Sequence, residues 1–212
     1  MSPSIELDRR VADVVTRGGV IAFRTDTFYG LGADPFNQGA VRRIKELKGR
    51  EDNKPILIVI SDYDQLGRFI TSISPSFQLL TSKFWPGALT LIGEARPELP
   101  PEITAGTKTV GVRLPNDDRV RLLVRACSGA LTATSANPSG AAPATTALQV
   151  REYFGDSVDL VIDDGGAQTD RPSTVVDVSQ NEPKLIREGV IAWSSIIDAL
   201  KGIKSSSPSG RD

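Results

Sequence analysis

RRIKELKGREDNKP, residues 42–55, is the stretch in which local structure and charge are most clearly specified. It carries six basic residues against three acidic ones, in a chain whose net charge is -1. Apolar side chains that share one helix face recur every three positions: Val41, Ile44 and Leu47. Gly49 tolerates positive φ and is predicted to end this helix, so that Lys48 and Arg50 lie where it opens into a loop. An exposed helix end with two cations would suit a polyphosphate or a carboxylate, although basic residues there also complement the helix dipole.

Composition limits the class of protein. With 212 residues, 39% of them hydrophobic and 24% charged, the chain is predicted to be soluble and globular, with enough residues for a substantial core. We expect a single domain over residues 1–203 and a disordered polar tail over residues 204–212. The polar N-terminus is unlike a secretory signal, and no apolar run reaches the length of a membrane span. These features favour a cytoplasmic protein with no membrane partner.

Histidine is absent, and Cys127 is the only cysteine. A Ser-His-Asp triad, a Cys-His pair, a histidine-ligated metal and an internal disulfide are therefore excluded. Cys127 follows apolar neighbours and is predicted to be a small buried hydrophobe. No metal site is predicted, because Asp163 and Asp164 are better explained as a solvated turn than as metal ligands. Acid–base chemistry near neutral pH would need an Asp, Glu, Lys or Tyr with a shifted pKa.

Short apolar runs alternate with helical patterns, which predicts an α/β fold. Strands are expected at residues 20–23, 56–60, 89–92, 110–114, 130–133, 159–162, 174–178 and 184–187. Helices are expected at residues 5–18, 41–48, 62–70, 76–84, 119–126 and 193–200, and from a cap at Thr145 or Thr146 to residue 154. The proline-rich residues 97–101 are predicted to be an extended or turning loop.

Two predicted strands end in polar loops, a common place for ligand binding in α/β sheets. Residues 24–32, RTDTFYGLG, are predicted to form a polar turn closed by two glycines. Residues 134–140, TSANPSG, place hydroxyl groups and an amide at a second strand end, and the side chains of Ser135 and Asn137 are predicted to project toward one cavity. An ordinary connection, or a turn that satisfies its own backbone, is the alternative in each case.

Arg113 is the one charged residue in the apolar run 110–114. A guanidinium inside a buried strand is costly unless it reaches solvent, a partner or a ligand. The sequence alone leaves these three possibilities open for Arg113.

Several motifs follow one another along roughly residues 10–190: TDTFYGLG (25–32), KGR (48–50) with KP (54–55), WPGALT (85–90), VGVRLP (110–115), TSAN (134–137) with SG (139–140), and PST (172–174). In this order they resemble the YrdC-domain family, the threonylcarbamoyl-AMP synthases. The resemblance implies an α/β fold with a twisted open sheet of mixed parallel and antiparallel strands, flanked by helices and with a concave basic face. It also favours the interpretation that the basic residues of the stretch 42–55 bind a ligand over the interpretation that they complement the helix dipole. The chain is expected to be the short single-domain form of the family.

Members of this family make L-threonylcarbamoyl-adenylate from L-threonine, bicarbonate and ATP, with release of diphosphate. The resemblance therefore implies a nucleotidyltransferase with ATP and bicarbonate as substrates and Mg²⁺ accompanying the nucleotide. Its product would serve the threonylcarbamoyladenosine modification of tRNA, which makes tRNA and the downstream tRNA threonylcarbamoyl transferase proteins candidate partners. One alternative is an RNA-binding module that uses the same basic groove, but aromatic residues make up only 6% and do not interleave with the basic ones. Another is a carbamoyl-transfer domain that acts with a second protein.

The resemblance also assigns roles to individual residues. It implies catalytic roles for Lys48 and Arg50. The residues implied in ATP binding are Arg50, Lys54, Thr109, Asn137, Thr145 and Arg187. The residues implied in threonine binding are Thr25, Thr27, Arg113, Ser135 and Ser173. The sequence departs from the family at Arg24 and Glu51, where proline is usual, and at residues 58–60, which lack a histidine that some relatives carry.

Overall fold

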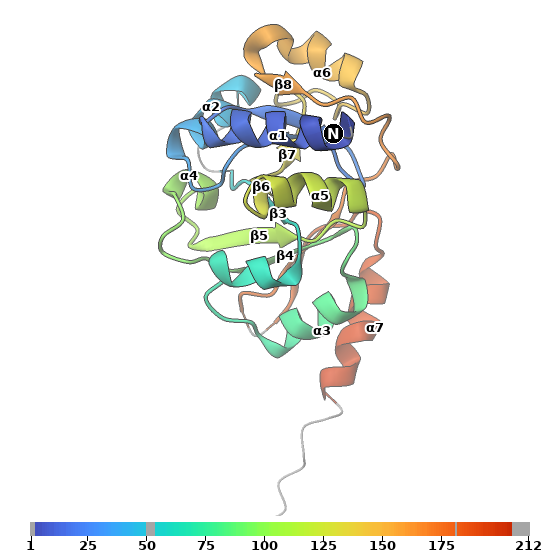
Figure 1. Cartoon of the computed structure of the whole chain (residues 1–212). Coiled ribbons are helices and arrows are strands. Elements are labelled where there is room, and N and C mark those ends of the chain that lie inside the picture. The colour runs from blue at the N-terminus through green and yellow to red at the C-terminus, as the bar shows by residue number, and fades with distance from the viewer. Residues whose placement is uncertain (1–2, 50–53, 181, 205–212) are drawn as a thin grey trace, which may run out of the picture.

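The computed structural model describes residues 3–49, 54–180 and 182–204, and within these residues the strands form two sheets (Figure 1). The smaller sheet has the order β7-β2-β1-β8, and the larger sheet has the order β10-β9-β4-β5-β3-β6. The smaller sheet comprises β1 (Ile21–Arg24), β2 (Tyr29–Gly32), β7 (Thr134–Ser135) and β8 (Leu160–Val161). The larger sheet comprises β3 (Ile58–Ile60), β4 (Leu89–Glu94), β5 (Thr109–Arg113), β6 (Ala130–Thr132), β9 (Thr174–Asp177) and β10 (Lys184–Arg187). Each sheet contains parallel and antiparallel pairs, which confirms the predicted mixed α/β fold.

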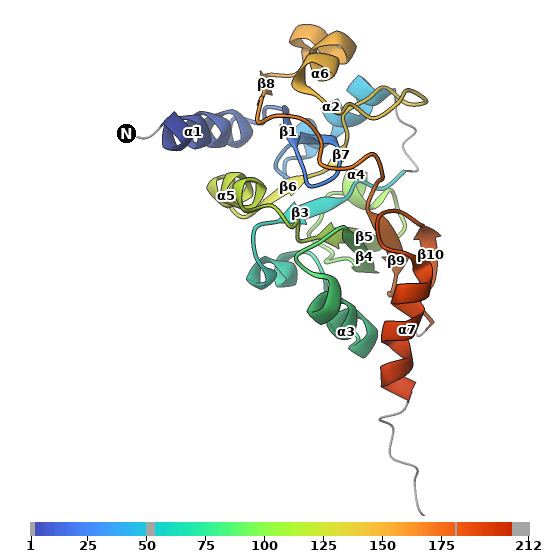
Figure 2. The ribbon, with the colours of Figure 1, turned by 90° about the vertical axis from the view of Figure 1, so that its right-hand side faces the viewer.

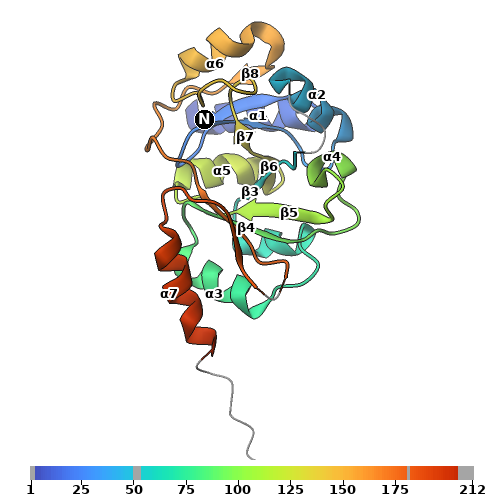
Figure 3. The same ribbon diagram turned by 180° about the vertical axis from the view of Figure 1, so that it is seen from behind.

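Helices flank both sheets. The α-helices are α1 (Pro3–Thr16), α2 (Gln38–Lys48), α3 (Pro75–Phe84), α4 (Pro101–Thr104), α5 (Asp118–Ala126), α6 (Ala147–Phe154) and α7 (Trp193–Lys204). Short 3-10 helices cover Tyr63–Arg68 and Gly155–Ser157. Figure 2 shows α1 and α5 together on one side of the molecule, and Figure 3 shows α6 at one end and the packed pair α3 and α7 at the other. Among the helices of the described residues, none has both the length and the apolar character needed to cross a membrane.

The apolar core joins the two sheets. One cluster packs α1 and α5 against strands of both sheets, with Ile21 and Phe23 from the smaller sheet and Val59 and Leu131 from the larger. A second, larger cluster likewise mixes residues of β1 and β2 with residues of β3, β4 and β5. Cys127 lies in the first cluster, as predicted, and burial raises the pKa of its thiol to about 12. The expectation of one domain over residues 1–203 stays a prediction, and of the predicted tail only Lys204, the last residue of α7, is described; residues 205–212 lie outside.

The expectation that Gly30 and Gly32 close a turn is wrong. Only residues 25–28 turn, and both glycines belong to strand β2, which pairs antiparallel with β1. Gly30 lies opposite Phe23 and Gly32 opposite Ile21, and it is Gly32 that makes room for the Phe23 ring. A Cβ built on Gly32 would lie 2.6 Å from Cε1 of that ring, which explains why glycine occupies a strand interior here.

Local signals predict the end of α2 but not its beginning. The helix ends at Gly49 with φ 57°, as predicted, but it begins at Asn37, whose side chain accepts from the Ala40 N–H, and not at residue 41. Ser74 caps α3, and of the two candidates for α6 it is Thr146 that caps the helix. Two predictions need correction. Residues 62–70 contain a 3-10 helix instead of a longer helix, and the loop predicted at 97–101 leads directly into α4.

Candidate active site

A cavity of about 410 Å³ lies where the two sheets meet. The smaller sheet contributes the turn between β1 and β2 and the strand β7, and the larger sheet contributes β3, β4, β5 and β10. The chain passes from β6 to β7 through Ala133 alone, which brings Ser135 opposite Gly30 beside the cavity. Six of the residues implied by the family resemblance line this space: Thr25, Thr27, Arg113, Ser135, Ser173 and Arg187.

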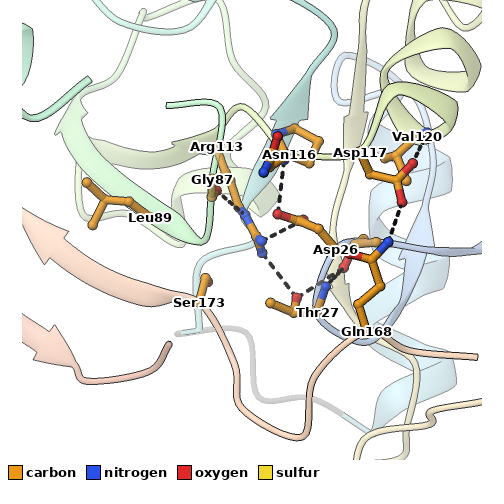
Figure 4. Close-up of polar contacts among 12 residues, drawn as sticks. Asp26, Thr27, Gly87, Leu89, Arg113, Asn116, Asp117, Val120, Gln168 and Ser173 are labelled. Atoms are coloured by element: carbon orange, nitrogen blue, oxygen red, sulfur yellow. Dashed lines mark hydrogen bonds and ion pairs between the residues drawn. The ribbon is translucent and has the colours of Figure 1, made fainter. Parts of the chain in front are cut away.

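Arg113 is buried at the end of β5, and its guanidinium faces the cavity (Figure 4). Its Nε donates to the backbone oxygen of Gly87 at 3.0 Å, and its Nη1 donates to the Thr27 hydroxyl at 3.1 Å. Its Nη2 lies 2.6 Å from a carboxylate oxygen of Asp26. A guanidinium carries five N–H groups, so one N–H on Nη1 and one on Nη2 have no partner among these contacts, and Nη2 itself is buried. Burial lowers the pKa of Arg113 from its ordinary value, and the Asp26 carboxylate opposes this shift.

Asp26 is the part of this site that sequence reasoning missed. A charge inside β5 indicated that Arg113 needs a partner, but the partner supplied by the protein itself is Asp26, in the turn after β1. The other carboxylate oxygen of Asp26 accepts from the Asn116 N–H at 3.0 Å. The available signal was an acidic residue within the TDT motif at a strand end, and the chain contains 26 acidic residues from which to choose.

The two threonines of this turn have different surroundings. The Thr25 hydroxyl donates to the backbone oxygen of Phe28 at 2.8 Å and lies 3.1 Å from the Thr27 hydroxyl. It therefore shapes the turn, as expected for a side chain that bonds its own loop. The Thr27 hydroxyl also accepts from Arg113, which places it beside the guanidinium. Both threonines line the cavity, and Thr27 lies next to the charge that would bind an anionic group.

Ser173 and Arg187 form the opposite wall. Arg187 donates from Nε and Nη2 to the backbone oxygen of Ser173, at 3.2 and 3.0 Å, and its Nη2 lies 3.2 Å from the Ser173 hydroxyl. That hydroxyl also lies 3.0 Å from the Thr90 hydroxyl. Burial lowers the pKa of Arg187 from its ordinary value, and the charge of Arg113 lowers it further. Two guanidinium groups that repel each other therefore face one cavity, which favours an anionic ligand.

The expectation of an exposed cation at Lys48 is wrong, because this residue is only 3% exposed. Its Nζ donates to the backbone oxygens of Ser135 and Asn137, the latter at 2.7 Å. The backbone oxygen of Lys48 in turn accepts from the Ser139 N–H at 2.7 Å. The end of α2 therefore holds the turn that follows β7, and Lys48 does not line the cavity.

The Ser-x-Asn turn confirms one part of its prediction and corrects another. Ser135 lines the cavity and Ala136 is fully buried, but Asn137 does not reach the cavity. The Asn137 amide instead donates to the backbone oxygens of Pro138 and Ala141, at 2.9 and 2.8 Å. It closes its own turn, which was the alternative interpretation of this motif.

The remaining expected site residues lie away from the cavity or outside the described residues. Thr109 is at the other end of β5 from Arg113, and its hydroxyl lies 3.0 Å from that of Thr107. The Thr145 hydroxyl donates to Gln149 at 2.9 Å. Lys54 is exposed and does not line the cavity, although the adjacent Pro55 does. Arg50 and Glu51 lie outside the described residues, so the implied roles of Arg50 stay predictions.

Carboxylates do not gather at one point in the part of the chain that the structure describes. Over residues 3–49, 54–180 and 182–204, no group of three or more Cys, Asp or Glu side chains is placed to hold a metal ion. Asp170 lines the cavity, while Asp26 lies behind the guanidinium of Arg113. Acceptor groups for a metal at this site would therefore have to come largely from a ligand.

The fold and the cavity define an α/β protein with a cationic, small-molecule-sized pocket between two sheets. Residues 13–189 match the family model of Sua5, YciO and YrdC, whose description reads "Telomere recombination". The chain belongs to this Sua5/YciO/YrdC family.

Similar proteins carry a consistent name. The threonylcarbamoyl-AMP synthase of Thiobacillus denitrificans is 43% identical over 164 residues, which cover 77% of this chain and 86% of that protein. The threonylcarbamoyl-AMP synthase of Pyrococcus abyssi is 36% identical over 92% of this chain, but the match spans only 58% of that protein. A crystal structure of P. abyssi Sua5 complexed with L-threonine is similar with a TM-score of 0.88 and 35% identity, over 91% of this chain and 57% of that one. This chain thus corresponds to little more than half the length of the P. abyssi protein.

Proposed function

We propose that this protein is a threonylcarbamoyl-AMP synthase, which joins L-threonine, bicarbonate and ATP into L-threonylcarbamoyl-adenylate and releases diphosphate. The observation that carries the proposal is the cavity beside Arg113, in a fold that matches a relative whose structure was solved with L-threonine. Homologues named for this activity, at 31–43% identity, support the enzyme over an RNA-binding module.

Threonine would bind at the Arg113 wall of the cavity. Its carboxylate would accept from the Arg113 guanidinium, which lines the cavity, in a charge-assisted contact stronger than one between neutral groups. Hydroxyl groups of Thr27, Ser135 and Ser173 surround this position and can orient the amino and hydroxyl groups of the substrate. Thr25 would contribute mainly by shaping the turn that carries Thr27.

The chemistry requires alignment of reactants more than proton transfer by a side chain. The threonine nitrogen forms a bond to the carbon of bicarbonate with loss of water, and the resulting carbamate oxygen attacks the α-phosphorus of ATP as diphosphate leaves. Holding the reactants together and neutralising phosphate charge are the main contributions a protein makes to such a step. Arg187, at the cavity rim, is the described cation best placed to meet the phosphates, and Arg50 is proposed to act with it.

The other implied nucleotide contacts divide into direct and indirect ones. Lys48 and Asn137 would act indirectly, by holding the turn that places Ser135 beside the cavity. Lys54, Thr109 and Thr145 stay predictions, because none of them lines the cavity. Mg²⁺ would enter with the triphosphate, whose oxygens are its preferred ligands. The product would pass to tRNA threonylcarbamoyl transfer, so the proposal includes a cytoplasmic location, with tRNA or its modifying proteins as partners.

The test is the reaction itself. The purified protein is incubated with ATP, labelled bicarbonate and one amino acid at a time, and both diphosphate and the labelled adenylate are measured. We expect both products with L-threonine, much less with L-valine, which lacks the hydroxyl, and none without bicarbonate. Diphosphate release that is independent of the amino acid, or salt-sensitive RNA binding without ATP turnover, would refute the proposal.

A further inference from the structure

We propose that Asp26 is a positioning residue, which holds the guanidinium of Arg113 in the orientation that receives the substrate carboxylate. This inference rests on the proposed function and deepens it. Nη2 of Arg113 lies 2.6 Å from Oδ1 of Asp26, and the two side chains are 7% and 6% exposed. Figure 4 shows the Asp26 carboxylate on one side of the guanidinium and Ser173 on the other.

The guanidinium is held at three points, two of them in the turn between β1 and β2 and one at Gly87. Gly87 accepts from Nε, Thr27 accepts from Nη1, and Asp26 pairs with Nη2. Three such contacts fix the plane of the group, because its N–H groups form a rigid planar fork. Of the three, Asp26 is the only charged one, so it contributes the strongest of these interactions.

The support for Arg113 comes from the other sheet. Arg113 ends β5 of the larger sheet, while Asp26 and Thr27 lie in the turn between β1 and β2 of the smaller sheet. Asp26 is itself anchored to the segment after β5, because its second oxygen accepts from the Asn116 N–H at 3.0 Å. The carboxylate therefore links the turn of the smaller sheet to the guanidinium and to the segment after β5 of the larger sheet.

A neutral side chain cannot replace this carboxylate. Arg113 is buried and faces a second cation, Arg187, so Asp26 supplies the nearby negative charge that keeps the guanidinium in place. Without that charge, the guanidinium would be held by neutral acceptors alone, and Asp170, which also lines the cavity, would compete for it. An Arg113 turned toward Asp170 would no longer present its guanidinium to threonine in the same orientation.

Asp117 provides a matched control on the neighbouring segment. It is also a buried carboxylate paired with an arginine, since its Oδ2 lies 2.8 Å from Nη2 of Arg24 and its side chain is 7% exposed. It caps α5 by accepting from the Val120 N–H, and Gln168 donates to it at 3.0 Å. It does not line the cavity, so Asp117→Asn removes a similar ion pair without touching Arg113.

The experiment compares Asp26→Asn, Asp117→Asn, Arg113→Gln and the double variant Asp26→Asn with Arg113→Gln. KM for threonine, KM for ATP and kcat are measured, together with the rise in Tm caused by saturating L-threonine. For Asp26→Asn we expect KM for threonine to rise at least tenfold and KM for ATP to stay within twofold. For Asp117→Asn we expect both constants within twofold of wild type, even where its Tm is lower. In the Arg113→Gln background, Asp26→Asn should cause no further rise in KM for threonine, because the two residues act as one unit.

The inference is overturned if Asp26→Asn keeps the wild-type KM for threonine and the wild-type threonine-induced rise in Tm. It is also overturned if the effects of Asp26→Asn and Arg113→Gln multiply in the double variant. If Asp26→Asn does not fold, Asp26→Glu is measured in its place. Glutamate keeps the negative charge but moves the carboxylate, so an unchanged KM for threonine in this variant would also overturn the inference. A wild-type protein without threonine-dependent adenylate formation would refute the proposed function instead, so the two failures are distinct.

Discussion

Replacing Lys48 by methionine separates a structural role from a catalytic one. The side chain is 3% exposed, and its Nζ donates to the backbone oxygens of Ser135 and Asn137. Methionine keeps most of the buried aliphatic length but removes the charge and, with it, these two hydrogen bonds. If the ammonium group mainly anchors the turn after β7, the variant should lose stability before it loses any ligand contact.

The magnitude follows from the two lost bonds. Hydrogen bonds to a charged group contribute about 1.5–3 kcal/mol each, which gives a gross loss of about 3–6 kcal/mol. Replacing a buried ion by an apolar group recovers about 1–4 kcal/mol of desolvation, and the centres of the two ranges leave a net destabilisation of about 2 kcal/mol. For a chain of this length, that corresponds to a fall in Tm of about 4–8 °C.

Arg42→Met is the matched control on the same helix. The Arg42 side chain is 59% exposed and forms an ion pair with Glu102 at 3.0 Å. Exposed pairs contribute about 0–1 kcal/mol, so this variant should melt close to wild type. Thermal unfolding of the three proteins, with and without ATP, provides the comparison. If Lys48→Met melts like Arg42→Met but no longer gains stability from ATP, the ammonium contacts the nucleotide and the anchoring role is wrong.

Two further variants test the fold around the cavity. Gly32→Ala should lower the free energy of unfolding by about 1–3 kcal/mol, because the added Cβ would lie 2.6 Å from the buried Phe23 ring; Gly67→Ala, with no atom within 4 Å of its Cβ, should stay within about 0.5 kcal/mol. Equal urea midpoints for these two variants would show that β2 does not need glycine. Burial raises the pKa of Asp159, but hydrogen bonds from Arg43 and from the Val20 N–H outweigh it, so the pKa in the folded state is lowered. The ionised Asp159 carboxylate therefore stabilises the fold at pH values above about 4, its pKa in the unfolded chain, and this contribution is lost as pH falls through the lower pKa of the folded state. Asp159→Asn should lower the free energy of unfolding by up to about 1 kcal/mol at pH 7 and by progressively less below about pH 4. A urea-unfolding difference that does not shrink with falling pH would contradict this account.

Helix α2 shows what local sequence can predict. Its apolar spacing, its capping asparagine and its terminal glycine are all local signals, and the structure confirms its buried face and its end at Gly49. The same local reasoning fails for Lys48, because burial of its side chain depends on a turn 87 residues further along the chain. Periodicity identifies the face of a helix but cannot show which distant backbone oxygens will meet its last side chain.

The glycines of β2 show a similar limit. Glycines that follow polar residues usually indicate a turn, and that interpretation placed Gly30 and Gly32 outside the sheet. The structure instead uses the missing side chain of Gly32 to accommodate Phe23 of the paired strand. The signal for this arrangement is an aromatic residue of β1 two positions from the residue that pairs with Gly32, and it becomes visible only once the two strands are known to pair.

Arg113 and Asp26 show how far such reasoning reaches at the cavity. A lone arginine in an apolar strand must have a partner, because an unpaired buried charge is costly, and this inference needed no structure. The identity of the partner depends on how the two sheets meet, since Asp26 belongs to the turn of one sheet and Arg113 to the end of a strand in the other. A single sequence does not show which residues of the two sheets come into contact. It also does not show that Arg187 lines the cavity, because Arg187 reaches it through the pairing of β10 with β9. The side chains that bind the ligand can thus be suggested by type and motif, while those that orient them become visible only when the contacts between the sheets are known.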